Sequence, residues 1–446
     1  MEVGSLKTCK PLENHHMKID WHDTCVADIP IREEKLYVKG ALVGRVGLLL
    51  LACGTGAWQV RHAMNRISRA LGLTCSVDVG LVSINYSCFD GHEWFSQTET
   101  LATSGVNTYK LKRLERFVRH FTSEGVHETA EELHQKLDAI ERTPGFYKPW
   151  QAALAAGAAC AAFTFLLGGG WQEMLLVFPA AFGGQYVRAR LLRRHYTMAF
   201  WIVASIAAAC LVYTLLARVA EALFGLAAIH EAGYICSMLF IIPGFPFITS
   251  GIDLAKLDLR SGLERLAYAL FIVIAACLTA WILALALNLH TADFTKLALL
   301  PWQYLLFRLL ASFTGVFGFS VMFNSSPKMC LAAACIGAIA NTLRLEMLDF
   351  LAVPPAFAAF IGAFVAGLLA SLLKRRTGIP RITMTVPSIV IMVPGLYMYK
   401  GIYNLGALEP TSSFAALASA ILILLALPAG LVFARLLADR DFRYCS

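Results

Sequence analysis

The chain has 446 residues, of which 58% are hydrophobic and only 15% are charged, and its formal net charge is +8. Soluble globular proteins are about half apolar and about a quarter charged, so this composition excludes an ordinary soluble protein. Residues 1–148 hold 18 basic and 18 acidic residues, which leaves 38 − 18 = 20 basic and 30 − 18 = 12 acidic residues for residues 149–446. The sequence therefore predicts a soluble domain joined to a membrane domain, and the positive charge needs no nucleic-acid partner.

The cysteines and the N-terminus give no indication of a metal site, a disulfide framework or a secretory signal. The twelve cysteines are scattered, without a CxxC pair or a Cys/His cluster at metal-ligand spacing. Most of them lie in apolar runs, where cysteine packs as a small hydrophobic residue. Residues 1–31 are polar and lack the apolar core of a signal peptide. We expect no metal and no cofactor.

The first third of the chain predicts a flexible arm over residues 1–36 and a small α+β domain over residues 37–148. The apolar run over residues 41–53 contains Arg45 and is too short to span a membrane, which takes about 20 apolar residues. It predicts a buried helix instead. We expect this helix to continue through residues 54–72, where apolar residues recur at helical spacing.

Two stretches rich in β-branched and aromatic residues follow, over residues 74–89 and 92–103. Asp90-Gly91 separates them and is a hairpin signal. The stretches therefore predict a small antiparallel sheet.

Amphipathic helices are predicted over residues 111–121 and 126–143, the second ending before Pro144. The polar residues of the domain form no nucleophile–base–acid pattern, and no Gly-rich phosphate loop is present. We therefore predict no catalytic residues and no ATP-driven pump.

After Pro149 the chain contains ten apolar segments. Their lengths are marginal to adequate for a hydrocarbon core about 30 Å thick. The segments cover residues 150–168, 172–187, 197–217, 222–247, 266–288, 303–322, 328–343, 356–373, 382–405 and 412–434. We group them as two five-helix membrane regions, over residues 149–290 and 300–440.

The charges between the segments predict an orientation, because cytoplasmic loops carry an excess of Lys and Arg. With ten spans, the side that holds both termini carries 15 Lys and Arg residues. The other side carries Arg218, Lys296, Arg344 and Lys400, and Arg308 lies inside a predicted span. We predict a multi-pass protein of the inner (cytoplasmic) membrane with both termini in the cytoplasm.

One pattern occurs twice. Pro243-Gly244 and Pro394-Gly395 each follow an apolar run and precede aromatic residues and Gly-Ile, and the prolines lie 394 − 243 = 151 residues apart. Each pair falls in the fourth of five segments. Because five is odd, the second set must enter the membrane from the opposite side. The predicted fold is an all-α membrane protein of ten transmembrane helices in two inverted five-helix repeats, a plan common in secondary transporters, with a small N-terminal α+β cytoplasmic domain.

Proline disrupts the helical hydrogen-bond ladder, and freed backbone groups are tolerated in a membrane only inside protein or beside a watery cavity. Paired breaks at symmetric positions therefore point to a binding site, although two structural kinks without a ligand are the alternative. The substrate-binding residues predicted around the breaks are Pro243, Gly244, Gly251, Pro394, Gly395, Tyr397, Lys400, Gly401 and Asn404.

Further polar residues extend the predicted site. Asn324 and Asn341 offer uncharged hydrogen-bonding groups for a small polar solute. Ser325 lies at a predicted helix start, where exposed N–H groups can hold a carboxylate, and an ordinary cap and loop is the alternative. Lys400 can neutralise a carboxylate or extend to the membrane interface.

His230 and Glu231, in the first broken segment, are the predicted proton-coupling residues. Ionisable groups inside spans are rare and often functional. A buried glutamate can load and release a proton near neutral pH. The alternative is that both residues face water at the membrane interface.

The chain resembles the threonine/serine exporter family over about residues 40–436. The soluble part is similar in "LLLLACGTGAWQVRHAMNRISRALGL", "VDVGLVSINYSCFDG" and "SGVNTYKLKRLERFVR", and the membrane part in "FGFSVMFNSSPKMCLAAACIGAIANTLR" and "VPGLYMYKGIYNL". The resemblance implies a ten-span inner-membrane exporter of small hydroxy amino acids, with some relatives moving dicarboxylates such as succinate. It also implies coupling to the proton motive force.

Three functions are therefore compared. The first is a secondary exporter of threonine, serine or a related small carboxylate, whose partners are a small polar solute, protons and the lipid bilayer, with homo-oligomer formation left open. The second is a membrane-bound hydrolase, which needs a catalytic constellation that the sequence does not provide. The third is a passive small-solute channel, whose flux would not depend on a proton gradient. We favour the exporter.

Overall fold

The computed structural model describes residues 20–25, 28–225, 232–289 and 297–443. The chain divides into two compact units. Unit 1 comprises Met1–Gly105 and Arg113–Thr143, and unit 2 comprises Val106–Lys112 and Pro144–Ser446.

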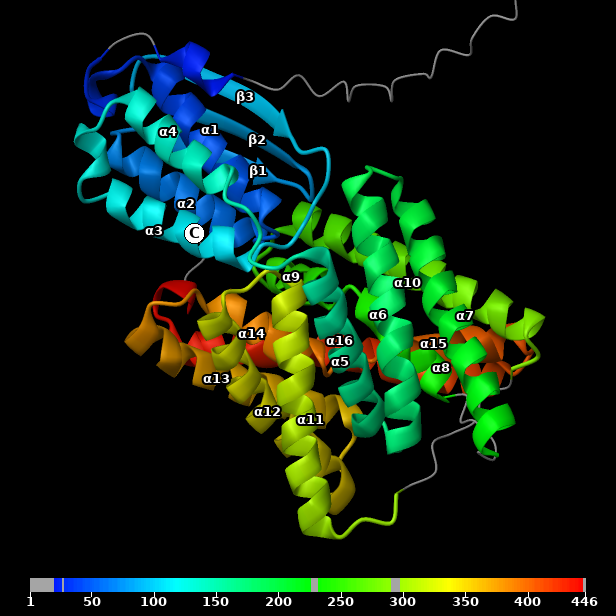
Figure 1. The fold of residues 1–446 in the computed structure, drawn as a ribbon. Helices are drawn as coiled ribbons and strands as arrows, with labels where there is room; N and C mark the ends of the chain where they lie inside the picture. The colour runs from blue at the N-terminus through cyan, green and yellow to red at the C-terminus, as the bar shows by residue number, and fades with distance from the viewer. Residues whose placement is uncertain (1–19, 26–27, 226–231, 290–296, 444–446) are drawn as a thin grey trace, which may run out of the picture. The chain divides into compact units, whose positions relative to one another are not determined.

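Unit 1 contains a three-stranded antiparallel sheet with helices packed on it (Figure 1). The strands are β1 (Thr74–Val79), β2 (Ser83–Phe89) and β3 (Trp94–Thr100), in the order β1-β2-β3. The helices are α1 (Leu36–Ala52), α2 (Ala57–Ala70), α4 (Ala130–Glu141) and most of α3 (Thr108–Phe121), with the short helices η1 (Trp21–Thr24), η2 (Ile31–Glu33) and η3 (Gly125–His127). α1 contacts β2 and β3, and α2 contacts β1.

The predicted hairpin at Asp90-Gly91 is confirmed, because Phe89 pairs with Trp94 across it and Gly91 has a φ of +107°. The stretch predicted over residues 74–89, however, forms two strands rather than one. β1 pairs with β2 in antiparallel register, with Val79 opposite Ile84. The first turn was missed because the residues between these strands carry no two-residue turn signal of the Asn-Gly or Asp-Gly type.

The predicted burial of the first helix is confirmed, but its continuation is wrong. Glycines face the sheet and α2: a Cβ atom on Gly44 would lie 2.1 Å from the Tyr86 hydroxyl, and one on Gly47 would lie 2.4 Å from the Met64 sulfur. The helix ends at Ala52 and α2 begins at Ala57. Gly54 between them has a φ of +83°, which a continuing helix does not allow.

Every described element of unit 2 is a helix. They are α5 (Pro149–Leu166), α6 (Trp171–Arg193), α7 (Met198–Phe224), α8 (Ala232–Cys236), η4 (Leu239–Ile241), α9 (Gly244–Ala255), α10 (Leu259–Ala286), α11 (Pro301–Met322), α12 (Pro327–Phe350), α13 (Pro355–Thr377), α14 (Arg381–Val390), α15 (Gly395–Gly406), α16 (Pro410–Ala438) and η5 (Asp441–Arg443). Proline starts five of them, since its fixed φ and missing N–H suit the first helical position. Gly225 and Gly378 end α7 and α13 in the left-handed conformation.

Within the described residues, seven helices are long and apolar enough to cross a membrane, and the number rises to nine if each of two bent pairs is one span. The seven are α5, α7, α10, α11, α12, α13 and α16. The bent pairs are residues 233–241 with α9, at 59°, and α14 with α15, at 45°. α6 lies at the remaining predicted segment and carries Glu173, Arg188, Arg190 and Arg193.

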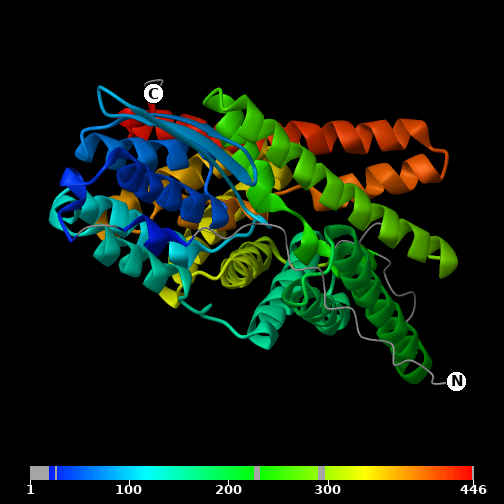
Figure 2. The same ribbon diagram turned by 90° about the horizontal axis from the view of Figure 1, so that it is seen from above.

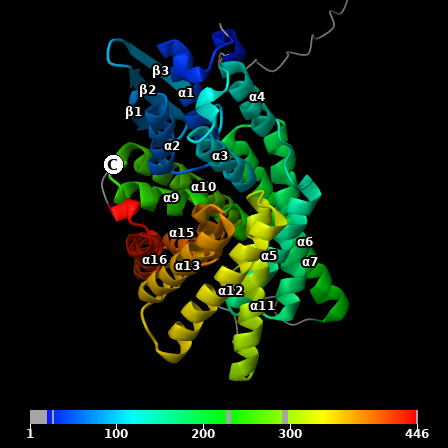
Figure 3. The same cartoon turned by 90° about the vertical axis from the view of Figure 1, so that its left-hand side faces the viewer.

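The interior of unit 2 combines large apolar side chains, such as Phe240 and Tyr399, with many buried alanines, and other large apolar side chains point outwards. Leu215 of α7, Ile282 of α10 and Leu425 of α16 are each more than half exposed. Small residues let membrane helices approach closely, and lipid accepts the apolar side chains that water would not. Figure 3 shows α5, α11 and α12 side by side, and Figure 2 shows α15 and α16 as neighbouring orange and red helices.

Candidate solute site at the two helix breaks

The two Pro-Gly pairs have nearly the same backbone conformation. Pro243 has φ −80° and ψ 59°, and Pro394 has φ −81° and ψ 53°. In both, the glycine N–H donates to the carbonyl two residues earlier, Ile242 at 2.8 Å and Val393 at 2.9 Å. This is an inverse γ-turn, which ends one helix and redirects the chain into the next. Both predicted helix breaks are thereby confirmed.

The two breaks also meet each other. A Cβ atom on Gly244 would lie 2.9 Å from a methyl group of Val390, and one on Gly395 would lie 1.9 Å from Ile242 and 3.1 Å from Leu239. Leu239 and Val390 each stand four residues before their own proline. The contacts are therefore reciprocal. Glycine is required at both positions because side chains at the other break occupy the space that a Cβ atom would need.

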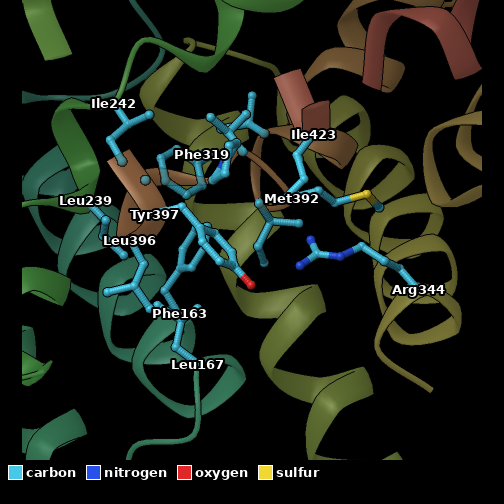
Figure 4. Close-up of a pocket in the computed structure, with 15 residues that line it drawn as sticks. Phe163, Leu167, Leu239, Ile242, Phe319, Arg344, Met392, Leu396, Tyr397 and Ile423 are labelled. Carbon is cyan, nitrogen blue, oxygen red and sulfur yellow. The ribbon is translucent and has the colours of Figure 1, made fainter. Parts of the chain in front are cut away.

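A cavity lies beside the second break. It is lined by Phe163 and Leu167 of α5, Leu239 and Ile242 of the first break, Phe319 of α11, Arg344 of α12, Val390–Tyr397 and Ile423 of α16. Figure 4 shows Arg344 extending into this space from α12, with the Tyr397 side chain facing it. Phe163 and Phe319 meet edge to face at 5.8 Å. The cavity is mostly apolar with one cationic group, the composition of a small-ligand site.

Arg344 is held in position by its own helix. Its Nη1 donates to Asn341 Oδ1 at 3.3 Å, and Asn341 Nδ2 donates to Ser312 Oγ at 2.9 Å. Asn341 and Ser312 are buried. The predicted residue Asn341 therefore lies behind the arginine and does not line the cavity itself.

A second arginine occupies the corresponding position of the first half of unit 2 (α5–α10; the second half is α11–α16). Arg188 lies 344 − 188 = 156 residues before Arg344, and its Nη1 donates to Gln185 Oε1 at 3.4 Å, as Arg344 does to Asn341. Its guanidinium stacks 5.0 Å from the ring centre of Trp201. The two halves thus share an arginine supported by an amide three residues earlier.

The groups that line the cavity suit the carboxylate group of a solute. Its volume is about 50 Å³, room for roughly three to five water-sized groups at about 10–15 Å³ each. Pro394–Tyr397, the start of α15, lines it, and the first N–H groups of a helix lack partners within the helix. A guanidinium and a helix N-terminus both favour a carboxylate.

Asn324 and Ser325 lie elsewhere and bind protein groups. Asn324 Nδ2 donates to Asn107 Oδ1 at 3.1 Å, and the Phe146 N–H donates to Asn324 Oδ1 at 2.8 Å. Ser325 Oγ and Thr108 Oγ1 are 2.7 Å apart. Both residues tie other segments of unit 2 to the start of α12, and neither lines the cavity.

The other predicted site residues follow the breaks along α9 and α15. Pro394, Gly395 and Tyr397 line the cavity, whereas Pro243 and Gly244 do not. Gly251 packs against Pro428 and Gly401 against Leu417, both on α16. Lys400 and Asn404 lie half-buried further along α15. His230 and Glu231 are outside the described residues.

Sequence reasoning missed Arg344 as a site residue because it ended the predicted segment at residue 343. The structure continues α12 to Phe350. The added turns carry Glu346 and Asp349, which pair with Arg308 of α11, so their charges do not oppose the continuation. The available signal was a second similarity between the halves, because residues 173–188 parallel residues 328–344 and each stretch ends in an arginine, Arg188 and Arg344.

Unit 1 contains its own buried polar cluster. Arg45 is only 2% exposed, bonds to His134 Nδ1 at 3.0 Å and pairs with Asp138. Burial, and then the nearby Arg45, lower the pKa of His134 to about 4. His22 bonds to Glu131 at 2.9 Å, and this bond raises the pKa of His22. The cluster connects α1, α4 and η1, and we interpret it as a structural contact between these elements.

Comparisons with known proteins match most of the chain to one family. Residues 41–288 match the family described as "Putative threonine/serine exporter", and residues 308–437 match "Threonine/Serine exporter, ThrE". A probable threonine/serine exporter of Mycobacterium tuberculosis is 26% identical over 89% of this chain and 75% of its own length. The threonine/serine exporter of Corynebacterium glutamicum is 25% identical over 90% of this chain and 82% of its own length.

A shorter relative matches about half of the chain. It is the probable succinate transporter subunit YjjP of Klebsiella aerogenes, 27% identical over 52% of this chain and 87% of its own length. No solved structure gives a significant match. The family matches and the apolar helices identify a multi-pass membrane protein that belongs to the threonine/serine exporter family.

Proposed function

We propose that this protein is a secondary transporter that exports threonine, serine or a related small carboxylate such as succinate, driven by the proton motive force. The carrying observation is the cavity in which Arg344 faces Tyr397 beside the break between α14 and α15. All these solutes have a carboxylate, which a guanidinium binds through charge-assisted hydrogen bonds. The names of the relatives support the same solute class.

The proposed architecture has ten spans, with α6 as one of them, arranged as two inverted five-helix repeats. Contacts between helices support this arrangement, because pairs in one half recur in the other: α5 with α6 and α11 with α12, α7 with α10 and α13 with α16. Contacts between the halves are also exchanged, since α9 meets α16 and α15 meets α10. Exchanged contacts are what a two-fold relation between the halves produces.

In the proposed mechanism the solute binds where the broken helices meet, and the two halves rock to open the cavity to either side. Such midplane sites between repeats are typical of secondary transporters. The proposed location is the inner membrane, with both termini in the cytoplasm, as the charge distribution between the segments favours. The lipid bilayer, protons and the solute are then the partners.

The test is transport by the full chain reconstituted in liposomes. Labelled threonine, serine and succinate are loaded, and efflux is followed with an imposed pH gradient and again after an uncoupler. Gradient-dependent efflux of at least one solute is the expected result. Flux that does not depend on the pH gradient would instead favour a passive channel. Absence of flux for all three solutes would refute the proposal.

A further inference from the structure

A buried ion pair joins α9 and α10, away from the cavity. Arg265 Nε lies 3.3 Å from Asp253 Oδ2, and Ser261 Oγ donates to the same oxygen at 2.9 Å. Arg265 Nε also donates to Ser261 Oγ at 3.1 Å. Asp253 is 0% exposed and Arg265 is 2% exposed. Arg265 lies on α10, which can cross a membrane, and Asp253 lies on α9, which belongs to a bent pair that can cross one. Ionisable residues in such segments are costly and usually functional.

The second half offers an internal comparison for this interface. The 151-residue offset that relates the two prolines continues along the next helices: Ser250 Oγ donates to the Gly262 carbonyl at 2.7 Å, and Ser413 Oγ donates to the Gly401 carbonyl at 2.6 Å. Since 401 − 250 and 413 − 262 both equal 151, one hydrogen bond is made at equivalent positions with donor and acceptor exchanged. The α9–α10 and α15–α16 interfaces therefore correspond residue by residue.

The ion pair is what distinguishes the two interfaces. By the same offset, 253 + 151 = 404 and 265 + 151 = 416, so Asp253 corresponds to Asn404 and Arg265 to Ala416. A purely structural bond would be expected in both halves, because both carry the Ser–Gly bond beside it. The charges occur in the first half alone.

We infer that Asp253 is the proton-binding residue of the transport cycle and that Arg265 is its counter-charge. This inference rests on the proposed function. A proton from water on one side adds to the Asp253 carboxylate, its ion pair with Arg265 is lost, and α9 can move against α10. The proton leaves to water on the other side, after which the pair forms again. Arg265 keeps its own protons throughout.

Other charged groups lie on the elements that pack against α9, and none of those named below bonds to Asp253 in place of Arg265. Lys256 contacts the Phe442 carbonyl and ring, and Asp258 precedes α10. Arg260 pairs with Glu264 on α10 at a half-exposed position. At the same end, Arg381 of α14 and Arg435 of α16 share Asp439. All of these groups are more exposed than the Asp253–Arg265 pair.

The experiment uses two readouts on the full chain in liposomes: exchange of labelled threonine without a gradient, and accumulation driven by a pH gradient. One pH unit can hold about a tenfold solute gradient for each coupled proton. The variant D253N/R265A, which installs the residues of the second half, should keep exchange and lose accumulation. Glu264→Gln, on the same helix, is the matched control and should keep both.

Several outcomes overturn the inference. The first is accumulation by D253N/R265A at the wild-type level. The second is loss of both exchange and accumulation in D253N/R265A protein that reaches the membrane. The third is loss of coupling in Glu231→Gln while D253N/R265A stays coupled. If the double variant does not fold, Asp253→Glu decides, because it keeps the charge and should shift the pH of half-maximal exchange; an unchanged pH profile overturns the inference. Wild-type protein that exchanges no solute would refute the proposed function instead.

Discussion

Replacing Arg344 with glutamine is the most direct perturbation of the proposed site. The guanidinium enters the cavity opposite Tyr397 and is supported by Asn341. Glutamine is close in size but cannot make a charged bond to a carboxylate. A hydrogen bond to a charged group contributes about 1.5–3 kcal/mol, so the KM for threonine or succinate should rise about 10- to 150-fold.

The effect on folding should be smaller than the effect on binding. Arg344→Gln removes the donor to Asn341 Oδ1, and losing one such bond costs about 1 kcal/mol. Arg308→Gln is a suitable control, because Arg308 is also an arginine of a membrane helix of the second half but bonds to Glu346 at 2.9 Å and does not line the cavity. It should change stability while leaving KM unaltered.

The assay measures efflux of labelled threonine and of threonine amide, which lacks the carboxylate, from liposomes that contain equal amounts of protein. Wild-type protein should prefer the acid strongly, and Arg344→Gln should lose this preference. Arg344→Lys should be intermediate, since lysine keeps the charge but not the bidentate geometry. An Arg344→Gln protein with unchanged KM and unchanged preference would refute the assignment of the cavity.

Three further predictions concern the supports of the site and unit 1. Gly395→Ala should destabilise the protein by about 1–3 kcal/mol through overpacking against Ile242, and adding Ile242→Ala should restore much of this loss in thermal unfolding. Asn324→Ala should cost about 1–3 kcal/mol by leaving its partners unpaired, with KM unchanged; a raised KM would support a role in solute binding. His134 has a pKa of about 4 in the folded chain and about 6.5 in the unfolded chain, so the unfolded chain binds the proton first as the pH falls. The free energy of unfolding should therefore decrease between pH 6.5 and pH 4, by about 3 kcal/mol at most, and hydrogen exchange of α4 should rise. Exchange that does not change between these pH values would contradict the prediction.

Local signals predicted the parts of the fold that short-range chemistry determines. Asp90-Gly91 can adopt the positive φ of a tight hairpin turn, and the Pro-Gly pairs must interrupt a helix because proline supplies no N–H. The helix break between Ala52 and Ala57 was missed, because the apolar spacing continues across it and the spacing carries no information about Gly54.

The site itself depended on pairings that sequence spacing does not reveal. From the sequence, Arg344 was placed in a loop between two spans. In the structure Glu346 and Asp349 pair with Arg308, and these pairs allow α12 to continue past Arg344. Asn324 and Ser325 resembled solute ligands, but they bond to residues more than 170 positions away in the sequence, Phe146 and Thr108. The role of a polar side chain such as Asn324 therefore depends on the residues that contact it in the folded protein.

The two halves agree in backbone but differ in charge, and this difference bears on the direction of transport. Two identical halves would make the inward-open and outward-open states equal in free energy, and a proton shifts such an equilibrium only if it binds the two states unequally. With Asp253 and Arg265 in one half and Asn404 and Ala416 in the other, protonation alters one of two otherwise matching interfaces. A tenfold solute gradient corresponds to about 1.4 kcal/mol, whereas breaking a buried ion pair by neutralising one partner costs about 3–5 kcal/mol. The pair breaks and forms again in each cycle, so the pH gradient supplies the work of transport, and the pair supplies the difference in free energy between the protonated and deprotonated interface.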